Sequence, residues 1–182
     1  LEGEALAFMA ERTRSGDPDN IEAQAARRYW PALMGEEFRR DRSAKGANAL
    51  LNYGYTIMRS MVARAVVAAG LHPTIGLHHA NRLNAFALAD DLVEPFRPLV
   101  DAVVRQLLDE GVEEVDRAAK MRLAALISAD VELMGSTSPV SVAAQRLAQS
   151  LAASFENGAL SIALFSTPRP LAWSAASFRD AR

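Results

Sequence analysis

One short stretch of this sequence, GLHHANRLNAFALADDLVEPFRP at residues 76–98, contains two adjacent histidines, two adjacent aspartates, a glutamate and two arginines. Glu94 follows Asp91 by three residues and Asp90 by four, so either pair shares one face of a helix, where two carboxylates repel each other unless a cation lies between them. His79 precedes them on an expected loop and can reach that face. An imidazole and carboxylates suit a divalent cation such as Mg²⁺ or Mn²⁺. Spacing alone also fits an ordinary solvated helix face, and it favours that simpler interpretation.

The two adjacent histidines are not equivalent. His78 and His79 point in different directions because they are neighbours in the chain, so only one of them is expected to share a site with Glu94. Glu22 is the other notable acid. It stands near the expected start of a helix, where a negative charge is favourable beside the positive helix end. Nothing in the spacing alone links Glu22 to His79.

Most of the chain carries the pattern of helices that would position these residues, because apolar side chains recur three and four positions apart. Asn20 and Asn48 are expected N-caps, Pro31 is expected to bend or shorten its helix, and Pro95 to kink a helix or divide it into two. The expected helices cover residues 2–14, 21–34, 49–69, 84 to beyond 107, 116–134 and 139–156, the last opened by Ser138 and Pro139, and residues 161–182 form an irregular tail. The sequence therefore predicts an all-α bundle of about six to eight helices, with no strand-rich segment, in a single domain over residues 1–182.

Composition narrows the class of protein further. The chain has 182 residues, half of them apolar, and a net charge of −2, which indicates a globular protein. It has no cysteine, so neither a disulfide nor a thiolate metal site can form. No apolar run is long enough to span a membrane, and the first residues do not resemble a signal peptide, so a cytoplasmic protein is expected. The overall charge does not indicate a nucleic-acid partner, although a local basic face can exist.

Three stretches together resemble a known family. They are NIEAQAARRYW, NALLNYGYTIMRSMVARAVVAAGLHPTIG and GLHHANRLNAFALADDLVEPFRPLVD. In this order they resemble the helical catalytic domain of the CRISPR-associated integrases that acquire spacers, the Cas-one family. The form is most similar to members from systems with a single large effector nuclease (type II). The resemblance is close over residues 21–104 and looser to about residue 156.

The resemblance implies roles for individual residues. Glu22, His79 and Glu94 match the family's catalytic metal ligands, and His79 is preferred to His78 because it stands three residues after Gly76 and fifteen before Glu94. Asp91 matches an aspartate that supports the site. Further matches are Asn48, Asn52 and Tyr53, which would face the site or DNA, and the basic positions Arg82 and Arg97.

The resemblance also implies an activity and partners. A Mg²⁺ or Mn²⁺ ion would polarise a scissile phosphate, and a DNA 3′-hydroxyl would attack it, joining a captured fragment to the repeat array; attack by water would give nuclease activity. The expected partners are double-stranded or branched DNA and the family's small companion adaptation protein, Cas-two. Family members also have an N-terminal β domain, absent from this sequence, through which a homodimer is expected. Phosphate contacts are expected from Arg27, Arg28, Arg39, Arg40 and Arg42.

Two other functions remain open on the residues alone. One is another metal-dependent enzyme on a helical bundle, such as a phosphohydrolase, which would usually draw several His and Asp ligands from several helices. The sequence has only three histidines. The other is a non-catalytic helical interaction module, in which the acidic residues belong to a solvated surface.

Overall fold

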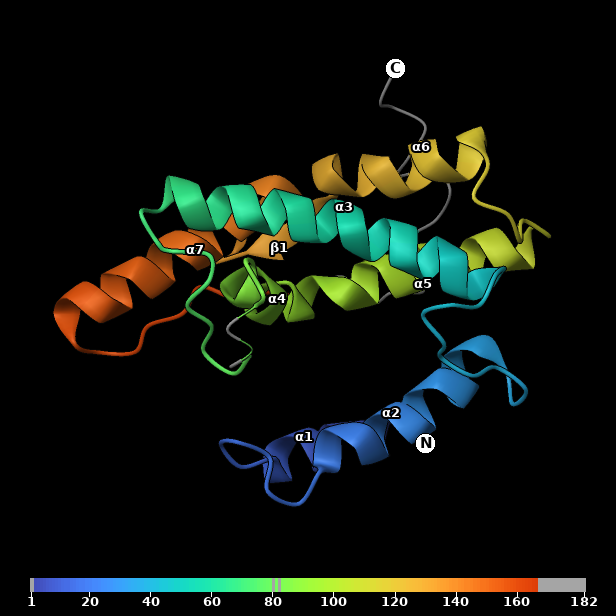
Figure 1. Ribbon diagram of the computed structural model, residues 1–182, viewed down its shortest axis with the longest axis horizontal. Helices are drawn as coiled ribbons and strands as arrows, with labels where there is room; N and C mark the ends of the chain where they lie inside the picture. Colours follow the sequence, from blue (N-terminus) through green and yellow to red (C-terminus); the bar gives the residue numbers. More distant parts are fainter. Residues whose placement is uncertain (1, 80, 82, 167–182) are drawn as a thin grey trace. The chain divides into compact units, whose positions relative to one another are not determined.

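The computed structural model describes residues 2–79, 81 and 83–166 (Figure 1). The chain forms two compact units, Leu1–Ala44 and Lys45–Arg182. The described residues form seven α-helices, two short 3₁₀ turns and three short strands, which confirms the mainly helical fold. The expected single domain over residues 1–182 stays a prediction. Among the described residues, every helix is too short or too polar to cross a bilayer.

The first unit is a helical hairpin in which α1 (Glu2–Arg12) packs against α2 (Ile21–Met34). The expectation that Asn20 caps α2 with its side chain is wrong: Asn20 has φ 53° and makes no capping hydrogen bond. Asp17 replaces it, because its two carboxylate oxygens accept hydrogen bonds from the amides of Ile21 and Glu22, each at 2.8 Å. The helix ends before Gly35, as the sequence predicts, but it continues past Pro31 and is not shortened there.

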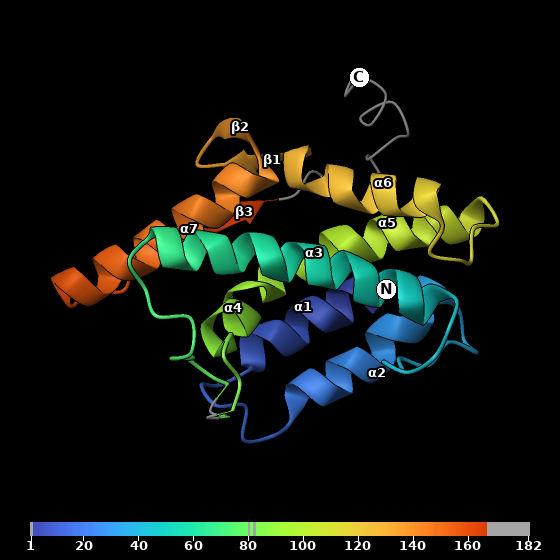
Figure 2. The ribbon, with the colours of Figure 1, turned by 45° about the horizontal axis from the view of Figure 1, so that its top comes forward.

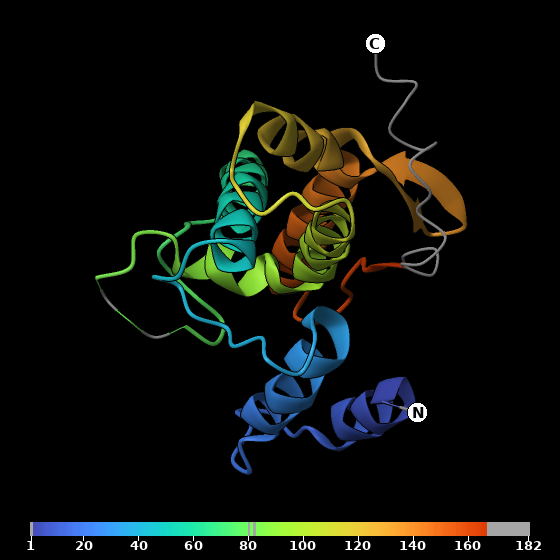
Figure 3. The ribbon, with the colours of Figure 1, turned by 90° about the vertical axis from the view of Figure 1, so that its right-hand side faces the viewer.

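The second unit is built around α3 (Ala47–Ala68), which packs against α4 (Ala87–Leu92), α5 (Arg97–Asp109), α6 (Arg117–Ala125) and α7 (Val140–Asn157). Figure 3 shows α3, in teal, end-on beside α5 and α7. The predicted apolar stripe of α3 lies in the core, with Leu51, Met58 and Val66 fully buried. Gly54 permits close packing against α5, because a Cβ at this position would lie 2.4 Å from Val100 Cγ1.

Two boundaries in this unit bear on the site. The expectation that Asn48 caps α3 is wrong: the helix begins at Ala47, and Asn48 lies in its first turn with 6% exposure. The cap position is taken by Gly46, whose φ of 64° suits a glycine. The division of the next helix at Pro95 is confirmed, because a 3₁₀ turn, η1 (Glu94–Phe96), separates α4 from α5. Glu94 therefore lies on a short turn rather than inside a long helix.

The helix predicted over residues 116–134 ends early, which is the main error of the sequence-based fold. After α6 and a second 3₁₀ turn, η2 (Leu126–Ser128), the chain forms β1 (Asp130–Leu133) and β2 (Ser136–Pro139), an antiparallel hairpin beside α7 (Figure 2). Met134 and Gly135 both have positive φ, at 51° and 77°, as a tight two-residue hairpin turn requires. Ser138 therefore belongs to a strand and does not cap α7, which begins at Val140.

The predicted tail is partly described. Its first residues return to the bundle, and β3 (Phe165–Ser166) pairs antiparallel with β1, so that the sheet has the order β2-β1-β3. Residues 167–182 lie outside the described residues. A segment that the sequence predicts to be irregular therefore forms the third strand, on the opposite side of β1 from β2.

Candidate functional site

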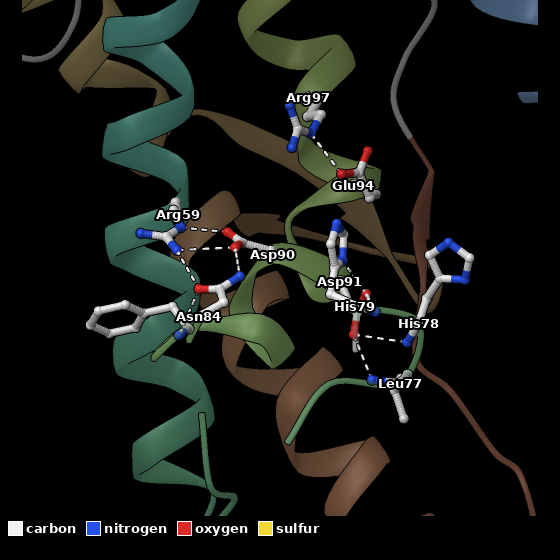
Figure 4. A network of polar contacts seen from close by, with 10 residues as sticks. Arg59, Leu77, His78, His79, Asn84, Asp90, Asp91, Glu94 and Arg97 are labelled. Atoms are coloured by element: carbon white, nitrogen blue, oxygen red, sulfur yellow. Dashed lines mark hydrogen bonds and ion pairs between the residues drawn. The ribbon is translucent and has the colours of Figure 1, made fainter. Parts of the chain in front are cut away.

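The carboxylate of Asp91 organises the loop that carries the two histidines. Asp91 lies on α4, and its oxygens accept hydrogen bonds from the backbone amides of Leu77, His78 and His79 at 2.5, 3.1 and 3.2 Å (Figure 4). The fourth donor is the side chain of His79, whose Nδ1 lies 2.6 Å from Asp91 Oδ1. The side chain of Asp91 is only 7% exposed. One nearly buried carboxylate therefore fixes three consecutive residues of the loop.

The surroundings of Asp91 favour its charged form. Burial alone would raise the pKa of its carboxyl group, but the hydrogen bonds from the His79 ring and from the amides of His78, Leu77 and His79 together hold that pKa below its ordinary value. A carboxylate that accepts several hydrogen bonds is typical of a group that orients another side chain. Asp91 therefore fits the supporting role that the family resemblance implies.

The hydrogen bond to Asp91 determines which nitrogen of His79 is available. A carboxylate at Nδ1 favours a proton on that nitrogen, which leaves the lone pair of Nε2 as a metal ligand or hydrogen-bond acceptor. Figure 4 shows the imidazole of His79 extending from Asp91 in the direction of Glu94, whereas the ring of His78 points elsewhere. The two rings lie at 86° to each other. The predicted inequality of the two histidines is thus visible in their directions.

Gly76 is required by the close packing of this loop. A Cβ built on Gly76 would lie 2.4 Å from the carbonyl oxygen of His79 and 2.9 Å from Asp91 Oδ2. The first of these atoms is backbone and cannot move independently, so any larger residue would displace the loop from the carboxylate. Close packing therefore explains why a glycine stands three residues before His79.

A second carboxylate, that of Asp90, connects the same helix to α3. The guanidinium of Arg59, on α3, holds Asp90 through two contacts, one of them Nη2 to Oδ2 at 3.0 Å. Asn84 joins them, because its Nδ2 donates to Asp90 Oδ2 at 2.7 Å and its Oδ1 accepts from the amide of Phe86 at 3.0 Å. Burial would raise the pKa of Asp90, but the hydrogen bonds from Arg59 and Asn84 and the positive charge of Arg59 lower it.

The sequence alone does not indicate Arg59 or Asn84, and it indicates Asp90 only as one of two carboxylates that share a helix face with Glu94. The only sequence feature that points to this contact is the position of Arg59 in a mostly apolar helix. A partly buried arginine there requires an acidic or polar partner. The contact joins residues 31 positions apart, so helical spacing could not have predicted it. Asp90 thus anchors α4 to α3, whereas Asp91 orients His79.

Glu94 and Arg97 form the third part of the site. Arg97 Nε lies 2.9 Å from Glu94 Oε1, and the side chain of Glu94 is 48% exposed. The guanidinium of Arg97 also lies over the ring of Tyr55, 4.8 Å from its centroid, and the hydroxyl of Tyr55 donates to the buried carboxylate of Asp101. The predicted DNA contact of Arg97 stays a prediction, and in this structure its partner is Glu94.

The three other candidate residues on α3 precede Arg59 in the helix. Asn48, Asn52 and Tyr53 occupy its first two turns, roughly 9–17 Å along the axis from Arg59 at 1.5 Å per residue. The carbonyl of Asn52 accepts a hydrogen bond from Thr56 at 2.8 Å, and Lys120 Nζ lies 5.9 Å from the centroid of the Tyr53 ring. Their expected contacts with the site or DNA stay predictions.

The other residues expected to contribute lie mostly in the first unit. Glu22 is exposed on the first turn of α2, so it belongs to a different unit from His79 and Glu94. Arg28 pairs with Glu2 at 3.6 Å, and Arg39 donates to the carbonyls of Glu36 and Phe38. Arg27 and Arg42 are exposed and Arg40 is half-buried. Arg82 lies outside the described residues.

The side chains of this site include donor types that can hold a metal ion. Among residues 2–79, 81 and 83–166, no group of three or more His, Cys, Asp or Glu side chains is gathered closely enough to hold a metal ion. The donor types fit nonetheless, because the arrangement combines an imidazole with its Nδ1 held by a carboxylate and an exposed carboxylate on the adjacent turn. This is the pattern found around metal-ligating histidines. The three-residue site with Glu22 stays a prediction.

The comparisons with known proteins identify the family of the chain. The sequence model of the family "CRISPR associated protein Cas1" matches residues 10–128, which is more than half of the chain. A mainly helical protein with this histidine–acid signature, matched over that length, belongs to the Cas1 family. The membership confirms the resemblance drawn from the three sequence stretches.

Individual relatives give the extent of the match. The chain is 46% identical over 111 residues to the CRISPR-associated endonuclease Cas1 of Neisseria meningitidis, a match that covers 61% of this chain and 36% of that protein. It is 36% identical over 154 residues to the CRISPR-associated endonuclease Cas1 2 of Pyrobaculum aerophilum, covering 81% of this chain and 52% of that one. The chain therefore spans about a third to a half of the length of these relatives.

A solved structure shares the fold. It is described as "Casposase bound to integration product" and has a TM-score of 0.68 to this chain, at 21% sequence identity. The likeness covers 87% of this chain and 56% of the other chain. At this identity it supports the arrangement of the helices and nothing finer.

Proposed function

We propose that this chain is the helical catalytic part of a metal-dependent DNA endonuclease and integrase of CRISPR adaptation. The observation that carries the proposal is the arrangement on α4 and η1, where Asp91 holds the ring of His79 and Glu94 presents an exposed carboxylate on the adjacent turn. Membership of the Cas1 family supports the same activity. The reaction is transesterification at a phosphodiester, in which a DNA 3′-hydroxyl joins a captured fragment to the repeat array.

Glu22, His79 and Glu94 would hold Mg²⁺ or Mn²⁺, for which their nitrogen and oxygen donors are suitable. When bound, such a cation polarises the scissile phosphate and favours the deprotonated form of the attacking hydroxyl. Asp91 keeps the proton of His79 on Nδ1 and so leaves Nε2 as the donor atom. Arg97, now beside Glu94, is placed to pair with a phosphate oxygen when that carboxylate takes another partner.

DNA would be bound largely through its phosphates. The candidate cations are those of the first unit and the histidine–acid segment, Arg27, Arg28, Arg39, Arg40, Arg42, Arg82 and Arg97. Because the net charge of the chain is −2, binding requires a local basic face rather than general attraction, and DNA affinity should fall steeply with salt. The further partners proposed are the small companion protein Cas-two and a second copy of the family's full-length protein joined through its β domain. A cytoplasmic location is proposed with them.

The decisive experiment measures strand transfer and nicking of branched DNA in Mn²⁺. Glu22→Ala, His79→Ala and Glu94→Ala should each lower the rate by roughly 10²–10³-fold, the usual effect of removing a group that stabilises the transition state. The matched controls replace the other two histidines of the sequence, in His72→Ala and His78→Ala, and both should remain near the wild-type rate. Wild-type activity in His79→Ala and Glu94→Ala would exclude the proposed site.

A binding measurement makes the outcome independent of turnover. Mn²⁺ titrations followed by electron paramagnetic resonance should show a bound ion in the wild type, weaker binding in each of the three site variants, and unchanged binding in His78→Ala. If the wild type binds neither Mn²⁺ nor DNA, the chain is better described as a non-catalytic helical interaction module.

A further inference from the structure

Residues 161–166, which we call the C-terminal arm, lie far in sequence from the site yet contact the element that carries Glu94. Two serines of α7 hold the start of the arm: the amide of Ser161 donates to Ser154 Oγ at 3.0 Å, and the amide of Ala163 donates to Ser150 Oγ at 2.9 Å. Its end is β3, in which Phe165 is paired with Leu133 of β1. The arm is therefore fixed at both ends to the second unit.

The side chain of Phe165 connects the arm to η1. Its ring stacks on that of Phe96, with centroids 4.7 Å apart and planes at 30°. Phe96 is fully buried and is the last residue of η1, two positions after Glu94. A 3₁₀ turn has three residues per turn, so side chains two positions apart point in different directions. The stacked pair therefore holds the buried side of the turn while Glu94 stands 48% exposed.

The turn is short and lies directly between two helices, α4 before it and α5 after it. It is three residues long, and its backbone hydrogen bonds include those from the amide of Phe96 to Val93 O, at 2.9 Å, and from the amide of Arg97 to Glu94 O. A 3₁₀ turn of this length has few hydrogen bonds of its own, so its orientation depends on tertiary packing as well as on the flanking helices. Phe96 is the buried side chain of the turn, and its packing therefore contributes to the direction of Glu94.

We propose that the C-terminal arm is a positioning element for Glu94, and that Phe165 is the positioning residue, acting through Phe96. The proposal rests on the proposed function in one respect, that Glu94 belongs to the reaction site. Phe165 touches neither DNA nor metal in this role. It fixes the turn from which the carboxylate projects, and its loss releases the turn without removing any ligand.

Amide hydrogen exchange tests the structural part directly. In Phe165→Ala, peptides that cover residues 93–97 should exchange about tenfold faster, because an aromatic pair and its buried area no longer oppose local opening. Exchange in α3 should remain at the wild-type rate. Leu164→Ala is the matched control, since Leu164 is the neighbouring residue of the arm and is 58% exposed. Phe165→Tyr keeps the stacked ring and should restore slow exchange.

Two results would overturn the structural part. One is exchange at residues 93–97 that stays within twofold of the wild type in Phe165→Ala. The other is an equal rise in α3, which would mean that Phe165 stabilises the whole unit and does not act on the turn.

The functional part has a separate measurement. Phe165→Ala should lower Mn²⁺ affinity and the turnover rate about tenfold while DNA affinity is kept, and Phe165→Tyr should recover both. If the turn is released but Mn²⁺ affinity and turnover are unchanged in Phe165→Ala while Glu94→Ala impairs them, the arm does not position the carboxylate. If Glu94→Ala itself has no effect, the proposed function has failed, and the exchange result still decides whether the arm holds the turn.

Discussion

Replacing Asp91 by Asn tests the central geometric claim, that one carboxylate orients His79. The substitution keeps the size and shape of the side chain but exchanges one acceptor oxygen for an NH₂ group. In the native structure both oxygens accept: Oδ2 from the amides of Leu77 and His78, and Oδ1 from the amide and ring of His79. An asparagine side chain must therefore turn a donor toward at least two of these four donors.

The size of the effect follows from these contacts. A hydrogen bond to a charged group contributes roughly 1.5–3 kcal/mol, and more is lost when a donor is left without a partner. The three amides belong to exposed residues, so water replaces part of what is lost. We therefore expect the loop to open more easily by about 1.5–2 kcal/mol, which corresponds to a rise of roughly 10–30-fold in the exchange of the three amides. Metal affinity should fall by about 10–100-fold, as when the partner of a ligating histidine is removed.

The assay is amide exchange at residues 77–79 by nuclear magnetic resonance, together with Mn²⁺ titration of the same samples. Asp109→Asn is the matched control, because Asp109 is an exposed aspartate paired with Arg105 one helical turn earlier. The reasoning is refuted if Asp91→Asn is folded and the three amides exchange within twofold of the wild type. It is also refuted if Asp109→Asn has the same effect.

Three other predictions follow from the same contacts. The carboxyl pKa values of Asp90 and Asp91 are lower in the folded protein than their ordinary value of 3.8. Both charged carboxylates therefore stabilise the fold at pH values above about 4, and this stabilisation is lost as the pH falls further. In urea unfolding between pH 7 and 3, the free energy of unfolding of Asp91→Asn should therefore fall less with acid than that of the wild type. Arg59→Gln should lower the free energy of unfolding by about 1–3 kcal/mol, because Asp90 loses its cation. The double variant Arg59→Gln/Asp90→Asn should be destabilised by less than the sum of the two single variants. Additive losses of stability in this double-mutant cycle would show that the two side chains are not coupled. Gly76→Ala should destabilise the histidine loop by about 1–3 kcal/mol and weaken Mn²⁺ binding. In the control Gly3→Ala, a Cβ meets nothing within 4 Å, so neither effect is expected. Thermal unfolding measures the stability of both variants, and titration measures their Mn²⁺ affinity.

Much of the fold could be predicted because its helices are long and their apolar positions are regular. The buried stripe of α3 and the division at Pro95 both follow from local rules that operate over a few residues. The hairpin of β1 and β2 could not be predicted in the same way. Each strand has four residues, and such a short alternation is not distinguishable from one helical turn. Its signal was the turn at Met134 and Gly135, which lies where a helix end was expected.

The predictions of the N-cap residues of α2 and α3 were wrong for a related reason. Asn20 and Asn48 are suitable residues for an N-cap, but a cap depends on backbone geometry as well as on residue type. At α2, Asp17 reaches the first amides of the helix from three residues before the cap position, so Asn20 is not needed. At α3, burial favours Asn48 inside the helix. Competition between nearby residues of this kind cannot be settled from a list of residue types.

The site shows a similar limit. The positions of His79, Asp91 and Glu94 follow from a compact motif, and the structure brings the first two together as the resemblance implies. The contacts that hold the motif in place join residues far apart in sequence, such as Arg59 with Asp90 and Phe96 with Phe165. These pairs have no fixed spacing, so a motif can indicate candidate metal ligands without indicating the residues that hold them in place.

The adjacent residues Asp90 and Asp91 show how one short helix, α4, can both pack against α3 and orient His79. Successive residues on a helix point about 100° apart, so two adjacent aspartates can hold partners on different sides. Asp90 faces Arg59 of α3 and fixes the helix, while Asp91 faces the histidine loop and fixes His79. The separation has a measurable consequence. Asp90→Asn should loosen α4 from α3 and impair stability more than metal affinity, whereas Asp91→Asn should do the reverse, although both remove one negative charge from neighbouring positions. A purely electrostatic role for this acidic pair would make the two variants alike.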